Sequence, residues 1–110
     1  MRDDRLRLED IREAIEQIER YACGGRQAFD EQELVRVWIL HHLQIVGEAC
    51  SGLSEEFRRL HPDEVWSDAT GFRNILVHHY FGIDDEAVWS VVERDLPALK
   101  LKVNQVLQGG

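Results

Sequence analysis

The stretch "RLRLEDIREAIEQIERYAC", residues 5–23, decides the fold class. Its apolar residues recur at spacings of three and four, which is the period of an amphipathic helix. They are Leu8, Ile11, Ile15, Ile18 and Ala22. Two glycines, Gly24 and Gly25, then stop the pattern. We therefore predict a first helix from about Arg5 to Cys23, with its acidic residues on a solvated face.

The second segment has the same periodicity and extends to about His61, where Pro62 follows. Asp30 is a candidate N-cap for it, with Glu33 three residues later as in a capping box. Two glycines interrupt the segment, and each marks either a close contact between helices or a bend. These are Gly47 and Gly52. The predicted apolar stripe comprises Leu34, Val37, Trp38, His41, Ile45, Val46, Ala49, Leu53, Phe57 and Leu60.

Two more helical segments complete the chain. The third runs from about Ser67 to Tyr80, with Gly82 as its stop, and the fourth starts near Asp84, which can cap it. Pro97 lies inside the fourth stripe and should kink or split that helix. Because strand-like alternation is missing and the connections are short, we predict an all-α, up-down four-helix bundle, with residues 1–110 as one domain.

Composition narrows the possible functions. The 110 residues suffice for one core, and 44% hydrophobic with 31% charged residues is typical of soluble globular proteins. The net charge of −8 argues against broad coating of nucleic acid, although a local phosphate pocket stays possible. The sequence has neither an apolar run of membrane-spanning length nor a signal-peptide core, so we expect a cytoplasmic protein without membrane contact. We interpret Cys23 and Cys50 as buried, reduced thiols.

The stretch "RNILVHHYFG", residues 73–82, combines helical periodicity with reactive side chains. Arg73 offers a planar fork for phosphate oxygens, and His78 can exchange a proton near neutral pH. A base, an acid and a cation suffice to cleave RNA without a metal. On a helix Arg73 and Tyr80 share one face, whereas Arg73 and His78 lie about 140° apart. From spacing alone, a solvated helix end is therefore favoured over a catalytic site.

The same residues resemble a known motif. Arg73, His78 and Tyr80 match the Arg-x4-His-x-Tyr motif of HEPN-domain ribonuclease toxins, and Asn74 fits the polar residue that often follows the arginine. The resemblance to the HepT-like branch extends over roughly residues 30–107. It is carried by "IVGEAC" (45–50), "VWSDATGFRNILVHHYFGIDDEAVW" (65–89) and "DLPALK" (95–100).

This resemblance implies a helical homodimer in which facing motifs form a composite cleft. It implies a metal-independent endoribonuclease, a toxin whose partner is a minimal nucleotidyltransferase antitoxin. By this likeness Arg73 would bind phosphate, His78 would act as acid or base, and Asn74 would orient either group or the substrate. Tyr80 would accept AMP from the antitoxin, and His79 occupies the variable position. The alternative is a non-catalytic HEPN subunit that binds partner or substrate for a nucleotidyltransferase.

Other polar residues have plainer interpretations. Glu48 is either a surface glutamate or a cleft carboxylate that pairs with Arg73, and we leave both open. His41 and His42 lack the spacing of a bundle metal site, so we expect no metal and no cofactor. Any RNA should meet a small basic zone rather than a broad positive surface. The candidates for this zone are Arg58, Arg59 and Arg73.

Overall fold

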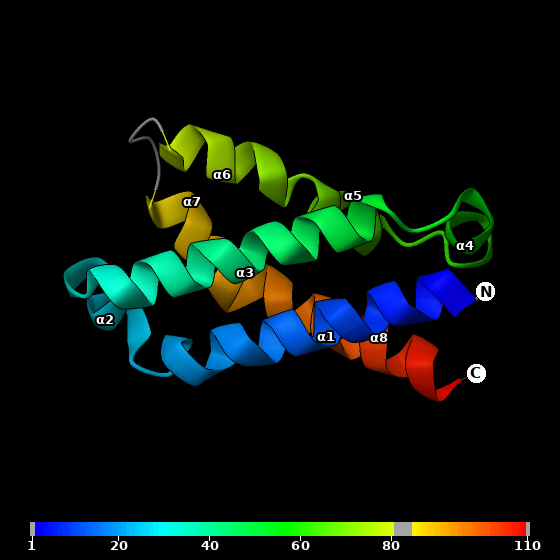
Figure 1. Cartoon of the computed structure of the whole chain (residues 1–110), viewed down its shortest axis with the longest axis horizontal. Coiled ribbons are helices and arrows are strands. Elements are labelled where there is room, and N and C mark those ends of the chain that lie inside the picture. Colours follow the sequence, from blue (N-terminus) through cyan, green and yellow to red (C-terminus); the bar gives the residue numbers. More distant parts are fainter. Residues whose placement is uncertain (1, 81–84, 110) are drawn as a thin grey trace.

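The computed structural model describes residues 2–80 and 85–109, apart from the side chains of residues 2 and 77–80. Within this part of the chain every regular element is helical, which confirms the all-α class (Figure 1). The elements are α1 (Arg2–Ala22), α2 (Gly25–Glu31), α3 (Glu33–Ser51), α4 (Glu55–Leu60), α5 (Glu64–Thr70), α6 (Phe72–Tyr80), α7 (Asp85–Ser90), the π-helical segment η1 (Val91–Asp95) and α8 (Leu96–Gln108). None of these helices is long and apolar enough to cross a membrane.

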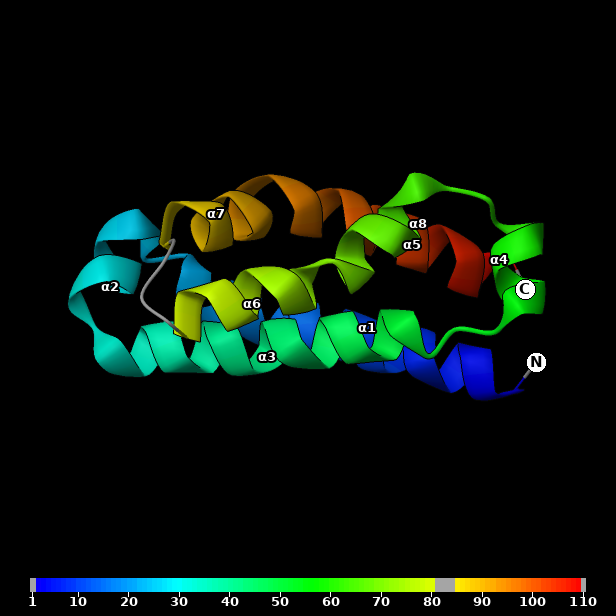
Figure 2. The same ribbon diagram turned by 90° about the horizontal axis from the view of Figure 1, so that it is seen from above.

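The chain makes four passes along its long axis. The passes are α1, then α3, then α5 with α6, and finally α7 through η1 to α8, and their directions alternate (Figure 1). Helices α1 and α3 lie side by side over most of their length, and α5 and α6 pack along α3 (Figures 1 and 2). Helix α8 closes the bundle against α1 and α5. The short helices α2 and α4 occupy opposite ends of this bundle (Figure 2).

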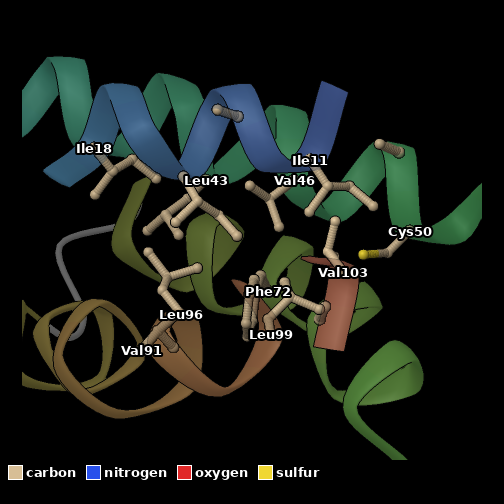
Figure 3. Packing of buried hydrophobic residues seen from close by; sticks show 14 of the residues in the cluster. Ile11, Ile18, Leu43, Val46, Cys50, Phe72, Val91, Leu96, Leu99 and Val103 are labelled. Carbon is tan, nitrogen blue, oxygen red and sulfur yellow. The ribbon is translucent and has the colours of Figure 1, made fainter. Parts of the chain in front are cut away.

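The core lies between these passes. Side chains of α1 and α3 meet those of η1 and α8 there, and Phe72 of α6 lies among them (Figure 3). Residues that are completely buried include Ile11, Ile15, Ile18, Ile39, Val46, Leu99 and Val103. Removal of this apolar surface from water is the main force that holds the four passes together. The periodic stripe of residues 5–23 therefore faces the core as predicted, and α1 extends only three residues further at its start.

The predicted second helix is wrong in its boundaries. Residues Gly25–Glu31 form their own helix, so Asp30 lies in its last turn, where it pairs with Arg26 at 2.8 Å. The N-cap of α3 is instead Gln32, whose side chain makes no capping hydrogen bond. At its other end α3 stops at Ser51, because the chain turns at Gly52 before α4 begins.

Four members of the predicted apolar stripe are also wrong as core residues, and one of them is the exposed His41. Leu34 is 84% exposed and Val37 is 55% exposed, so this side of α3 faces outward. Leu60, at the end of α4, is 62% exposed. These three apolar residues lie near helix ends or on the outer side of α3, where no other pass of the described chain covers them. Periodicity identified the helix correctly but could not tell which apolar residues have a neighbouring pass to pack against.

The third and fourth segments differ from the prediction in detail. Gly71 separates α5 from α6, so two short helices replace the single helix expected from Ser67. Gly82 and Asp84, the predicted stop and cap, lie outside the described residues. Pro97 does not end the last helix, because η1 precedes it and Leu96 donates its N–H to the Val91 carbonyl. This wider turn accommodates a proline that cannot donate a hydrogen bond and whose ring would clash in a regular α-helix.

One acidic residue of α1 is buried, contrary to the predicted solvated face. Asp4 is 5% exposed, and its carboxylate accepts hydrogen bonds from the Ser54 N–H at 2.8 Å and the Ser54 hydroxyl at 2.6 Å. The Ser54 hydroxyl oxygen in turn accepts from the Phe57 N–H at 3.0 Å and caps α4. Asp4 therefore joins the beginning of α1 to the beginning of α4.

The two cysteines occupy different environments. Cys50 is fully buried, and its burial raises the pKa of the thiol to about 12. The prediction that Cys23 is buried is wrong, because it is exposed and its thiol donates a hydrogen bond to the Arg20 carbonyl at 3.2 Å. Cys23 lies just beyond the end of α1, where the chain leaves the bundle, so the helical stripe no longer directs it inward.

Candidate functional site

The motif helix α6 is held by its apolar side. Trp66 and Ala69 of α5 and Phe72 of α6 are buried, and Ile75 and Leu76 pack partly buried against the same core. These residues follow one another at helical spacing across the Gly71 junction. The opposite side of α6 carries Arg73 and Asn74, and both side chains are exposed. The local sequence thus anchors one side of the motif helix and presents its polar side.

Arg73 lies directly over α3. A Cβ atom built on Gly47 would be 2.9 Å from Arg73 Cγ, so the arginine stem occupies the space that a side chain at Gly47 would need. None of the described acidic side chains forms an ion pair with Arg73. The stem is therefore packed near the α3–α6 contact while the exposed guanidinium keeps its charge available for an anion.

Glu48 follows Gly47 on α3 but does not pair with Arg73 in this chain. Its side chain is exposed and accepts a hydrogen bond from the Gln44 Nε2 at 3.2 Å. A carboxylate with this exposure needs no partner, since water solvates it. Within the single chain the geometry therefore matches the surface interpretation of Glu48, and a role in the cleft stays a prediction.

The side chains of His78 and Tyr80 belong to the part of α6 that lies outside the described side chains. The helix backbone nevertheless assigns their positions. Position 78 follows Asn74 by four residues, about one helical turn. Position 79 follows Phe72 by seven residues, and position 80 follows Arg73 by seven, so each is about two helical turns further along α6. The roles of His78 and Tyr80 therefore stay predictions.

The predicted basic zone is only partly available. Arg58 donates to the carbonyls of Cys50 at 3.0 Å and Leu53 at 3.3 Å, so its guanidinium covers the carboxyl end of α3. Arg59 is exposed but lies on α4, at the end of the bundle opposite to the last turn of α6 (Figure 1). Of the three predicted arginines, Arg73 is thus the one that is exposed and lies on the motif helix itself.

His42 and the tryptophans are used in packing, whereas His41 is exposed. His42 Nδ1 lies 2.8 Å from the Trp38 carbonyl oxygen, and Trp38 donates its indole N–H to the Gln17 carbonyl at 2.9 Å. Trp66 is 2% exposed and belongs to the core. Over the described residues, no three His, Cys, Asp or Glu side chains gather closely enough to hold a metal ion.

The role of Gly47 in α3 could not be decided from the sequence, although the motif on α6 could be predicted. Gly47 was an interruption that marked either a contact or a bend, and the structure shows a contact because α3 continues straight through it to Ser51. The sequence indication of this contact was a glycine inside an amphipathic helix, because so small a residue permits a second helix to approach closely. Which helix approaches, and which of its side chains fills the space, depends on tertiary packing.

Comparison with known proteins adds independent information. The family model described as "Ribonuclease HepT-like" matches residues 11–106. A protein of Thermococcus cleftensis named "Probable ribonuclease HepT" is 37% identical over 102 residues, covering 90% of this chain and 91% of the relative. A Methanocaldococcus jannaschii protein with a provisional RNase name is 33% identical over 106 residues, covering 96% and 97%. No solved structure matches the chain.

Proposed function

We propose, from the premise that this chain belongs to the HepT-like ribonuclease family, that it is an endoribonuclease toxin whose catalytic pair is Arg73 and His78. One observation carries the proposal. Helix α6 packs its apolar side on the core and leaves Arg73 exposed, without an ion-pair partner among the described residues, on the helix that also holds positions 78 and 80. An exposed guanidinium on the same helix as a histidine and a tyrosine supports phosphate binding at this position.

The chemistry needs one cation and one proton carrier. The ribose 2′-oxygen attacks the neighbouring phosphorus, the bond from phosphorus to the 5′-oxygen breaks, and a 2′,3′-cyclic phosphate forms. A base removes the 2′-hydroxyl proton, and an acid returns a proton to the 5′-oxygen. His78 serves as base or acid, because an imidazole titrates near the operating pH. Arg73 binds the phosphate oxygens through its planar fork and stabilises the charge that develops on them.

The site is proposed to be completed in a homodimer. One chain offers one Arg73 and one His78, whereas the reaction uses an acid, a base and a cation. Exposed apolar residues such as Leu34 and Val37 on α3 provide surface that a second chain would cover. Light scattering should therefore give twice the chain mass at micromolar concentration. A monomer that still cleaves RNA would contradict the composite cleft.

Control of the toxin is proposed to act on Tyr80. The resemblance to HepT-like toxins suggests a minimal nucleotidyltransferase antitoxin that transfers AMP from a nucleoside triphosphate to the tyrosine hydroxyl and releases pyrophosphate. Position 80 shares the face of Arg73, so the added phosphate would lie beside the guanidinium and the nucleoside would fill the cleft. Co-expression should add AMP at Tyr80 and stop cleavage. A Tyr80→Phe protein that the antitoxin still neutralises would show that binding alone is sufficient.

The decisive experiment incubates the purified protein with RNA in parallel with Arg73→Ala and His78→Ala. Loss of one positioned acid–base group typically costs about a hundredfold to ten-thousandfold in rate, so both variants should be nearly inactive while keeping their helicity. Arg59→Ala is the matched control, because Arg59 is equally exposed but lies on α4. Full activity of His78→Ala, or strict dependence on an added divalent cation, would refute the mechanism. Wild-type protein that accepts AMP but does not cleave RNA would favour the non-catalytic HEPN subunit.

A further inference from the structure

The contact between α3 and α6 leaves no space for a side chain at position 47 unless Arg73 moves. Gly47 is buried on α3, and a Cβ atom placed there would lie 2.9 Å from Arg73 Cγ. The next atoms are the Ala69 carbonyl oxygen at 3.5 Å and the Arg73 backbone nitrogen at 3.6 Å. Those two distances are ordinary van der Waals contacts. A methyl group at position 47 would therefore displace the Arg73 stem while the backbones of α5 and α6 stay in place.

Displacement of Cγ has a large effect at the end of the side chain. Cγ is fixed by the first side-chain torsion, which prefers staggered positions about 120° apart. A side chain that cannot keep one position must move to another, and a change at Cγ is amplified along the stem to the guanidinium. Positioned catalytic groups are sensitive to such shifts, since about 1 Å of misplacement can cost roughly a hundredfold in rate.

We infer that Gly47 is a positioning residue for Arg73. Because glycine has no side chain, it leaves the space for the Arg73 rotamer that directs the guanidinium toward the phosphate of RNA. This inference rests on the proposed function and adds to it a residue on a different helix. Gly47 itself touches no substrate and acts only through Arg73. Its position in a regular part of α3 gives no conformational reason for a glycine, because the helix continues through it. The space it leaves is the remaining reason.

The inference predicts an unusual combination of effects for Gly47→Ala. Alanine favours helix more than glycine does, so the variant should unfold at the same temperature as wild type or higher. Its kcat/KM for RNA cleavage should nevertheless fall by about tenfold to a hundredfold, because Arg73 is misplaced. Gly52→Ala is the matched control. It adds the same methyl group at the end of the same helix, beneath the exposed Arg7 instead of Arg73.

A double-mutant cycle separates positioning from a general packing effect. If Gly47 acts through Arg73, adding Gly47→Ala to Arg73→Ala should cause no further loss, beyond the about twofold scatter expected of unrelated sites. The ¹⁵N–¹H signal of Arg73 Nε should shift in Gly47→Ala and stay unchanged in Gly52→Ala. This second measurement reports the side-chain position without relying on activity.

The outcomes are distinguishable. Wild-type protein that cleaves RNA together with an equally active Gly47→Ala would overturn the role of Gly47 and leave the proposed function intact. An equal loss in the wild-type and Arg73→Ala backgrounds, or a lowered unfolding temperature that accompanies the loss, would also overturn it. Wild-type protein without RNA cleavage would instead refute the proposed function, and this inference with it.

Discussion

Replacement of Asp4 by alanine should destabilise the protein far more than its place in an acidic N-terminal segment suggests. The carboxylate is 5% exposed and accepts from both the backbone N–H and the hydroxyl of Ser54, at 2.8 and 2.6 Å. The same hydroxyl oxygen accepts from the Phe57 N–H and caps α4. Loss of the carboxylate therefore affects the beginning of α1, the turn after α3 and the first turn of α4 together.

The magnitude follows from these contacts. A hydrogen bond to a charged group contributes about 1.5–3 kcal/mol, and a buried donor left without a partner adds to the loss. Because the two bonds share one carboxylate and one serine, we expect Asp4→Ala to cost about 2–4 kcal/mol rather than the full sum. For a domain of about 100 residues this corresponds to a fall in Tm of about 10–25 °C. Asp4→Asn keeps one acceptor oxygen and should cost about half as much.

Thermal and urea unfolding, followed by circular dichroism, measure this cost. Asp3→Ala is the matched control, because Asp3 is an exposed neighbour in the same first turn of α1 and interacts equally with the helix dipole. The reasoning would be refuted by Asp4→Ala and Asp3→Ala proteins with equal unfolding midpoints. A large loss in Asp4→Ala alone would support the connection between α1 and α4.

Three further predictions concern the same end of the bundle and the thiols. Arg58→Ala should cost about 1.5–3 kcal/mol in urea unfolding, because the carbonyls of Cys50 and Ser51 in α3 and of Leu53 in the following turn lose a charged donor, whereas Arg59→Ala should cost almost nothing. Burial raises the pKa of the Cys50 thiol from 9.0 to about 12, so the unfolded chain loses this proton first as pH rises above 9. Between pH 8 and 10 the wild type should therefore lose about 1.3 kcal/mol more stability than Cys50→Ala, measured by urea unfolding; equal losses would exclude this effect. A thiol reagent should titrate one cysteine in the folded chain, Cys23, and none in Cys23→Ser.

The sequence predicted the elements that have a strong apolar stripe and failed where the chain turns. Residues 5–23 gave α1 almost residue by residue, since a regular stripe leaves one way to face a core. The Asp30 and Glu33 capping box was wrong because residues Gly25–Glu31 form a separate helix, which shifts the true start of α3 to Glu33. Local sequence allowed both starts, and the choice depends on how α2 packs at the end of the bundle.

The candidate site was predicted as a set of residues but not as a geometry. The motif identified Arg73 and Asn74, and the structure shows both exposed on α6. Neither the contact of Arg73 with Gly47 nor the use of Arg58 to cover the end of α3 could be read from spacing. The first joins residues of two different passes, and the second joins α4 to the chain around the end of α3 across an intervening turn. Such contacts become visible only when the passes are placed side by side.

The widened turn of η1 has a consequence for anyone who would redesign this bundle. A segment that closes its hydrogen bonds over five residues holds about one residue more per turn than an α-helix. Converting Val91–Asp95 into a regular α-helix without removing a residue would rotate α7 by about 100° relative to α8. Val88, now completely buried, would then turn out of the core. The π turn thus sets the rotation of α7 relative to α8, and a regular α-helix in its place would turn the buried side of α7 away from the core.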